Sequence, residues 1–91
     1  MPRYLVEREI PGAGQLSRAE LRVISKTSVS VLREVGRGLT WLQTFVVDDK
    51  MYCIFDALSP ELIHEHARCM GIPANRVSEI AATIDPSTAS E

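Results

Sequence analysis

The sequence has little of what marks most specialised protein classes. Among its 91 residues, 5% are aromatic and two are cysteine. No apolar run approaches the roughly 18 residues that cross a bilayer, so we expect no membrane partner. Acidic and basic residues nearly balance, with a formal net charge of −2, and we expect no nucleic-acid partner because a basic face is missing. The composition predicts one small soluble globular domain.

Signals for export and for catalysis are also missing. The segment from Met1 to Arg8 lacks the apolar core of a secretion signal. Cys53 and Cys69 form no Cys-X-X-Cys pair, and a secreted domain of this size usually carries more possible disulfides. We therefore expect reduced thiols in a cytoplasmic protein. No zinc-protease motif, nucleophile elbow or phosphate loop is present, which favours a protein that is not an enzyme.

Two amphipathic segments predict helices. Ser17 and Glu20 form a capping box at the start of the first, and Gly36 ends it. The second opens at Ser59-Pro60, with serine as the cap and proline in the first turn, and stops at Gly71.

The remaining apolar segments predict strands. They alternate with turn residues, as expected for strands, and comprise Tyr4–Ile10, Leu39–Val47, Met51–Ala57 and Val77–Ile84. The order βαββαβ predicts an α+β, ferredoxin-like fold over residues 1–84, with two helices on one face of a four-stranded antiparallel sheet. Residues 85–91 are expected to form a flexible tail.

The second expected strand is apolar on both sides. Simple alternation places Leu39, Trp41, Phe45 and Val47 on one side and Leu42 and Val46 on the other. Because the helices cover only one face, the open face would expose apolar side chains to water. We therefore expect a homodimer that forms through the open sheet face.

One histidine of the second helix lies on its apolar side. At about 100° per residue, His66 falls in the same sector as Ile63 and Ala67, whereas His64 falls on the polar side. Two interpretations stay open. His66 is either a core histidine held by one hydrogen bond, or a metal ligand or pH-sensitive group.

Several other residues are candidates for a site. Cys53 lies within a strand, where a small buried hydrophobic residue is expected. Glu7 and Glu79 lie on strands of the sheet and need a partner or a cavity, so we expect ion pairs within the sheet or dimer contacts. Further candidates for a pocket are Tyr4, Trp41 and Gln43.

Three segments resemble a known family: RYLVERE, WLQTFVVDDKMYCIFDA and SPELIHEHARCMGIPANRVSEI, between Arg3 and about Pro86. They are similar to a small bacterial ferredoxin-like family of unknown function that includes a nickel-binding protein. The resemblance implies a dimer without established catalysis that binds or tolerates nickel or another divalent transition metal, with His66, Glu7 and Cys53 as candidate ligands. Similar sequences often have histidine where this chain has Gln43, and an amide is a poor nickel ligand.

Three functions follow as hypotheses. The first is metal binding through His66 with Glu7 or Cys53. The second is a non-catalytic interaction module whose dimer is the functional form. The third is an enzyme without a cofactor, with His66 as base beside Glu7 or Tyr4, an idea that rests on analogy between folds. The sequence identifies no substrate or small-molecule ligand.

Overall fold

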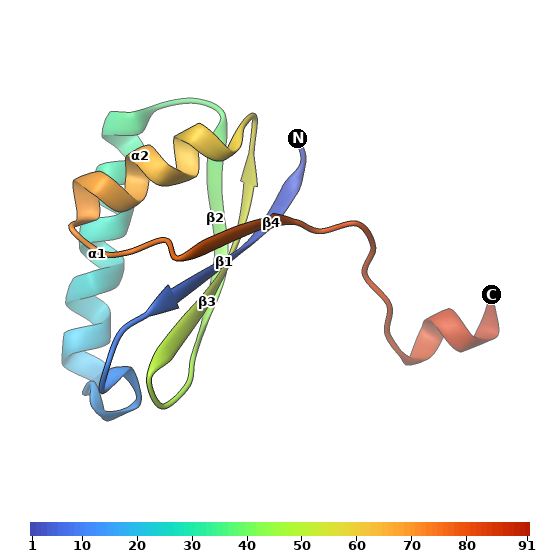
Figure 1. The fold of residues 1–91 in the computed structure, drawn as a ribbon, viewed down its shortest axis with the longest axis horizontal. Helices are drawn as coiled ribbons and strands as arrows, with labels where there is room; N and C mark the ends of the chain where they lie inside the picture. The colour runs from blue at the N-terminus through green and yellow to red at the C-terminus, as the bar shows by residue number, and fades with distance from the viewer.

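The computed structural model describes residues 1–91 and has two helices packed on one face of a four-stranded sheet (Figure 1). The strands follow the order β2-β3-β1-β4, and every neighbouring pair is antiparallel. This topology confirms the ferredoxin-like α+β prediction. The strands are β1 (Arg3–Glu9), β2 (Leu39–Val46), β3 (Lys50–Ala57) and β4 (Arg76–Glu79), and the helices are α1 (Arg18–Val35) and α2 (Pro60–Met70).

The helix ends largely follow the predicted signals. The Ser17 side chain accepts a hydrogen bond from the Glu20 amide at 3.1 Å, and the Glu20 carboxylate accepts one from the Ser17 amide at 2.9 Å. Gly71 caps α2 with φ of 71°, a left-handed conformation that favours glycine. Ser59 caps α2 through its extended backbone alone, because its side chain makes no capping hydrogen bond. Neither helix has the length and apolar character needed to span a lipid bilayer.

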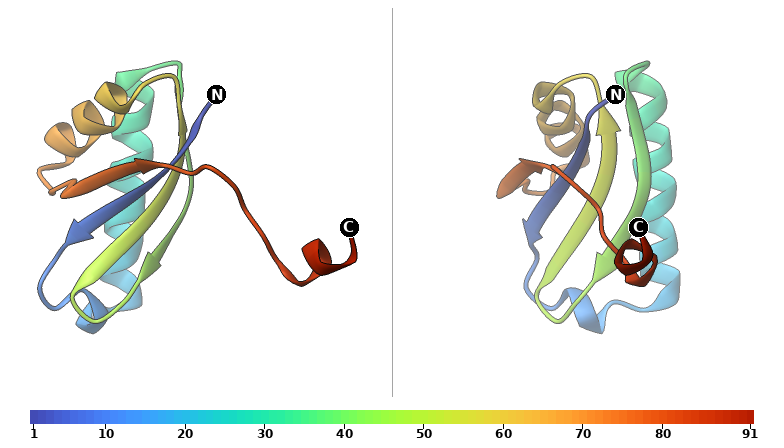
Figure 2. Two further views of the ribbon diagram at one scale, coloured as in Figure 1. Left: turned by 45° about the vertical axis from the view of Figure 1, so that its right-hand side comes forward. Right: turned by 90° about the vertical axis from the view of Figure 1, so that its right-hand side faces the viewer.

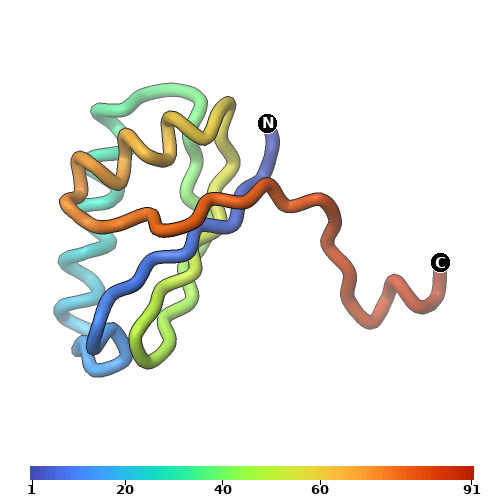
Figure 3. The backbone as a smooth tube through the Cα atoms, viewed as in Figure 1, coloured from blue at the N-terminus to red at the C-terminus, as the bar shows by residue number.

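The last strand is shorter than predicted. β4 ends at Glu79, not at Ile84, because its partner β1 begins at Arg3 and the Ile80 amide already donates to the Arg3 carbonyl. The chain then leaves the sheet on the side opposite the helices (Figures 2 and 3). There a short 3-10 helix, η2 (Pro86–Ser90), begins at Asp85, whose carboxylate accepts a hydrogen bond from the Ser87 amide.

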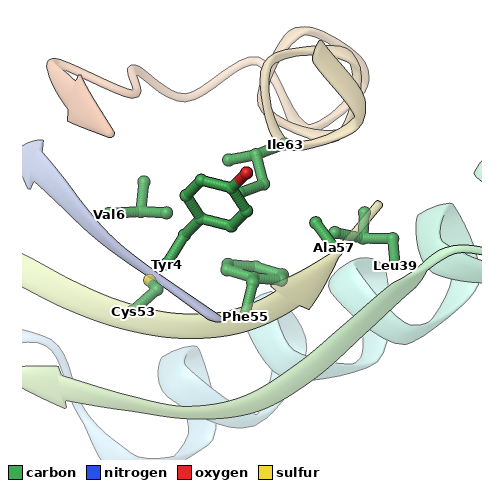
Figure 4. Packing of buried hydrophobic residues seen from close by; sticks show 7 residues of the cluster. All are labelled: Tyr4, Val6, Leu39, Cys53, Phe55, Ala57 and Ile63. Carbon is green, nitrogen blue, oxygen red and sulfur yellow. The ribbon is translucent and has the colours of Figure 1, made fainter. Parts of the chain in front are cut away.

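The core lies between the sheet and the helices. Tyr4 and Val6 of β1, Phe55 of β3 and Ile63 of α2 point toward one another there (Figure 4). In β1 and β3 every second residue is buried, so each strand has one helix-facing side and one open side.

A β-bulge changes the faces of β2. Trp41 is opposite Phe55, but Gln43 is already opposite Ile54, so Leu42 is an extra residue between them. Beyond the bulge Val46 shares the helix-facing side with Trp41, and Phe45 lies on the open side. The prediction that Phe45 shares a side with Trp41, and Val46 with Leu42, is therefore wrong.

Candidate functional site

A cavity of about 160 Å³ lies between α1, the end of α2 and the sheet. Most of its wall is apolar and comes from both helices and from strands β2 and β3. Polar side chains interrupt that wall, among them Arg8, Ser28, His66 and the thiol of Cys53. Pockets of this kind, apolar with a few convergent polar groups, are the usual form of small-molecule sites.

Arg8 is the most unusual residue of this cavity. It lies on β1 at the same parity as Tyr4 and Val6, so it points into the core, and it is only 1% exposed. Its Nε donates to the Cys53 sulfur at 3.4 Å and its Nη1 donates to the Pro73 carbonyl at 2.9 Å. No carboxylate lies within ion-pair distance of it. A buried guanidinium without a counter-charge is costly, by several kcal/mol.

Cys53 joins Arg8 to the wall formed by β2. Its sulfur accepts a second hydrogen bond, from Thr44 Oγ1 at 3.1 Å. Thr44 Oγ1 in turn accepts a hydrogen bond from Trp41 Nε1 at 2.9 Å. The thiol is 5% exposed and forms no disulfide, as expected for a small buried residue. These bonds fix the positions of Arg8 and Trp41 on two sides of the cavity.

His66 is the inward histidine that the helical periodicity predicts. It is 2% exposed, its Nε2 lies 3.1 Å from Ser28 Oγ, and its ring packs edge-on against Phe55 with centroids 5.4 Å apart. Burial, and next the positive charge of Arg8, lower the pKa of His66 from 6.5 to about 4. The ring is therefore neutral at pH 7. Its Nδ1 is buried without a hydrogen-bond partner.

The other predicted site residues are dispersed. Glu7 lies on the open face, 3.9 Å from Arg76 of β4, which is the ion pair within the sheet that was expected. Gln43 is exposed on the same open side, opposite Ile54. Tyr4 is part of the core, and Glu79 is exposed on the edge strand opposite Tyr4. Only Trp41, Cys53 and His66 of the predicted set meet at the cavity.

Two cavity residues were missed as site candidates, Arg8 and Ser28. The sequence signal for Arg8 is its position. Tyr4, Val6 and Arg8 are alternate residues of a central strand, so their side chains point to the same side of the sheet. Ser28 lies on the apolar stripe of α1, where a hydroxyl needs a partner.

Comparison with known proteins adds to this picture. The family model for nickel responsive proteins like SCO4226 matches residues 4–80. The chain belongs to the SCO4226-like family. The crystal structure of SCO4226 from Streptomyces coelicolor A3(2) has the same fold, with a TM-score of 0.75 and 13% sequence identity over 90% of this chain and 99% of that one. No curated protein sequence matches the chain.

The three predicted ligands do not form a nickel site within one subunit, although nickel is named in the description of the SCO4226-like family. His66 and Cys53 face the helices, whereas Glu7 is on the opposite side of the sheet. The Cys53 sulfur already accepts two hydrogen bonds, one of them from cationic Arg8, and that charge repels a metal cation. The unpartnered Nδ1 of His66 would provide only one metal-coordinating atom. No group of three or more metal-binding side chains gathers anywhere in the chain.

Proposed function

We propose that this chain acts in a nickel response as a homodimeric, non-catalytic binding protein, joined to its copy through the open face of the sheet. The proposal rests on the character of that face. Its central rows include Leu5 and Ile54, directly opposite each other, and Tyr52 opposite Phe45, with polar residues at the other positions of the same rows. Phe45 is 52% exposed. An aromatic and aliphatic centre of this kind is typical of protein interfaces.

The charged residues of the open face neutralise one another. Arg3 donates to Asp56 across β1 and β3 at 2.7 Å, which lowers the pKa of the Asp56 carboxyl, and Glu7 pairs with Arg76. Glu9 and Lys50 are opposite each other at the end of the same two strands. The face therefore has an apolar centre and no net charge to repel a second copy. Such a surface suits a two-fold dimer, in which each copy presents the same patch.

The surface area also supports a partner. The chain exposes 6174 Å², roughly 900 Å² more than a monomer of this mass is expected to expose. One side of a standard interface covers about 800 Å². The segment after β4 extends on the open side of the sheet, with Ile84 78% exposed. In the proposed dimer, this segment would lie near the copy that covers the face.

Replacing Phe45 with lysine tests the proposal. The added charge would lie within the proposed interface, where an unpaired charge is unfavourable. We therefore expect a monomer in sedimentation velocity where the unchanged protein is a dimer. Val23→Lys is the matched control, because Val23 is 63% exposed on α1, away from this face. A monomeric unchanged protein, or a Phe45→Lys variant that dimerises equally well, would contradict the proposal.

Nickel binding provides a second prediction. Because one subunit does not assemble three ligands, a nickel site needs donors from two subunits, and Glu7 is a carboxylate within the open face. Calorimetric titration with nickel is expected to give the same isotherm for the unchanged protein, His66→Gln and the surface control His64→Gln. Phe45→Lys, which we expect to be monomeric, should bind nickel more weakly than the unchanged protein. Loss of nickel binding in His66→Gln alone would place the metal at the inner histidine and refute this account.

A further inference from the structure

We propose that the cavity beneath α1 binds a small organic monocarboxylate, with Arg8 holding the carboxylate and Trp41 and Phe55 contacting its apolar body. The cavity is on the helix-covered side of the sheet, so this site is independent of the open face and of dimer formation. The observation that carries the proposal is a buried cation at the wall of a cavity with no anion beside it.

The donors of Arg8 are only partly used. Nε donates to Cys53 and Nη1 to Pro73, and the other N–H groups of the guanidinium donate to no protein atom. A planar guanidinium with free N–H groups matches the two oxygens of a carboxylate, which it binds bidentately. Arg18 also lines the cavity and adds a second positive charge. The cavity therefore has a positive potential that a ligand anion would neutralise.

The protein's own carboxylates do not fill this role. Glu7, the acidic residue adjacent to Arg8 in sequence, points to the open face and pairs with Arg76. No aspartate or glutamate lines the cavity, and the ionisable residues of its wall are Arg8, Arg18, Cys53 and His66. His66 is neutral or, when protonated, positive, so it does not balance the charge of Arg8.

The rest of the wall defines the ligand's body. Trp41 and Phe55 provide aromatic surface, while Leu21, Ile24 and Met51 add aliphatic surface. An apolar cavity of about 150 Å³ holds benzene, and this cavity measures about 160 Å³. A single six-membered ring or a short aliphatic chain that carries one carboxylate thus fits in both size and charge. A free inorganic anion would leave the apolar wall without contacts.

Titration with benzoate and with its neutral analogue benzamide tests the site. Trp41 is the only tryptophan of the chain and lines the cavity, so its fluorescence reports occupancy. We expect saturable binding of benzoate and binding of benzamide about tenfold to a hundredfold weaker, the range set by hydrogen bonds to a charged group. Arg8→Met should lose this preference for benzoate, whereas Arg22→Met, which removes an exposed charge from α1, should keep it.

A second variant protects the test against misfolding of Arg8→Met. Ser25 lines the cavity from α1, and Ser25→Leu fills part of the space while Arg8 stays in place; benzoate should bind at least about tenfold more weakly. Benzoate and benzamide binding equally, or full benzoate affinity in Arg8→Met or Ser25→Leu, would overturn the proposal. So would benzoate binding gained only in Cys53→Ser, because the Cys53 side chain would then be the group that occupies the Arg8 guanidinium.

Discussion

Replacing Arg8 with methionine is expected to stabilise the ligand-free protein by about 1–4 kcal/mol, the range found when buried ion pairs are replaced by well-packed apolar residues. Arg8 is 1% exposed and has no carboxylate partner, so its burial opposes folding. Methionine has a flexible apolar side chain that fills irregular space. The loss of the hydrogen bond to the Pro73 carbonyl subtracts about 1 kcal/mol from the gain. Urea unfolding at neutral pH measures the difference.

Arg22→Met is the matched control for this experiment. Arg22 is exposed on α1, and surface substitutions of this kind change the free energy of unfolding by less than about 0.5 kcal/mol. A destabilisation of Arg8→Met by more than about 1 kcal/mol would mean that the guanidinium is compensated in the folded protein. In that case the cavity would not need an anionic ligand.

The second large effect is the acid sensitivity that His66 gives the fold. The folded pKa of about 4 lies below the unfolded value of 6.5, so the unfolded chain binds the extra proton first. The free energy of unfolding therefore falls as the pH drops from 6.5 to 4, by about 3 kcal/mol in total, and is independent of this group above pH 6.5. The positive charge of Arg8 also opposes protonation of His66.

Comparison of unfolding between pH 4 and 7 in His66→Gln isolates this contribution. Glutamine keeps a polar group near Ser28 but takes up no proton, so the variant should lose stability less steeply in acid than the unchanged protein. His64→Gln, on the exposed side of the same helix, should retain the full slope. Equal slopes in all three proteins would show that the pKa of His66 is not lowered by folding.

The sequence was sufficient for the fold because local signals agreed with one another. The capping box at Ser17, the cap at Gly71 and the alternation along β1 and β3 all point to the same six elements. The prediction was wrong where a tertiary contact determines which side a residue faces or where a strand ends. The bulge at Leu42 exchanges the sides of Phe45 and Val46, and the pairing of β4 ends where β1 begins.

The site was only partly predictable. Helical periodicity placed His66 inside, and a carboxylate on a central strand correctly suggested an ion pair for Glu7. Arg8 was not predicted as a site residue because arginine is rarely buried without a partner. Its burial follows from the register of β1 against β3 and β4. The three proposed metal ligands were grouped by resemblance, which carries no information about sheet faces.

A single crystallographic experiment tests the central claim that the inner cavity accepts an anion and not a metal cation. Crystals grown with both nickel and benzoate would be measured at the nickel absorption edge. The account predicts a benzoate carboxylate within hydrogen-bond distance of the Arg8 guanidinium, with no anomalous signal between His66 and Cys53. A nickel ion bound by His66 and Cys53, seen as an anomalous peak, with no benzoate at Arg8, would contradict it.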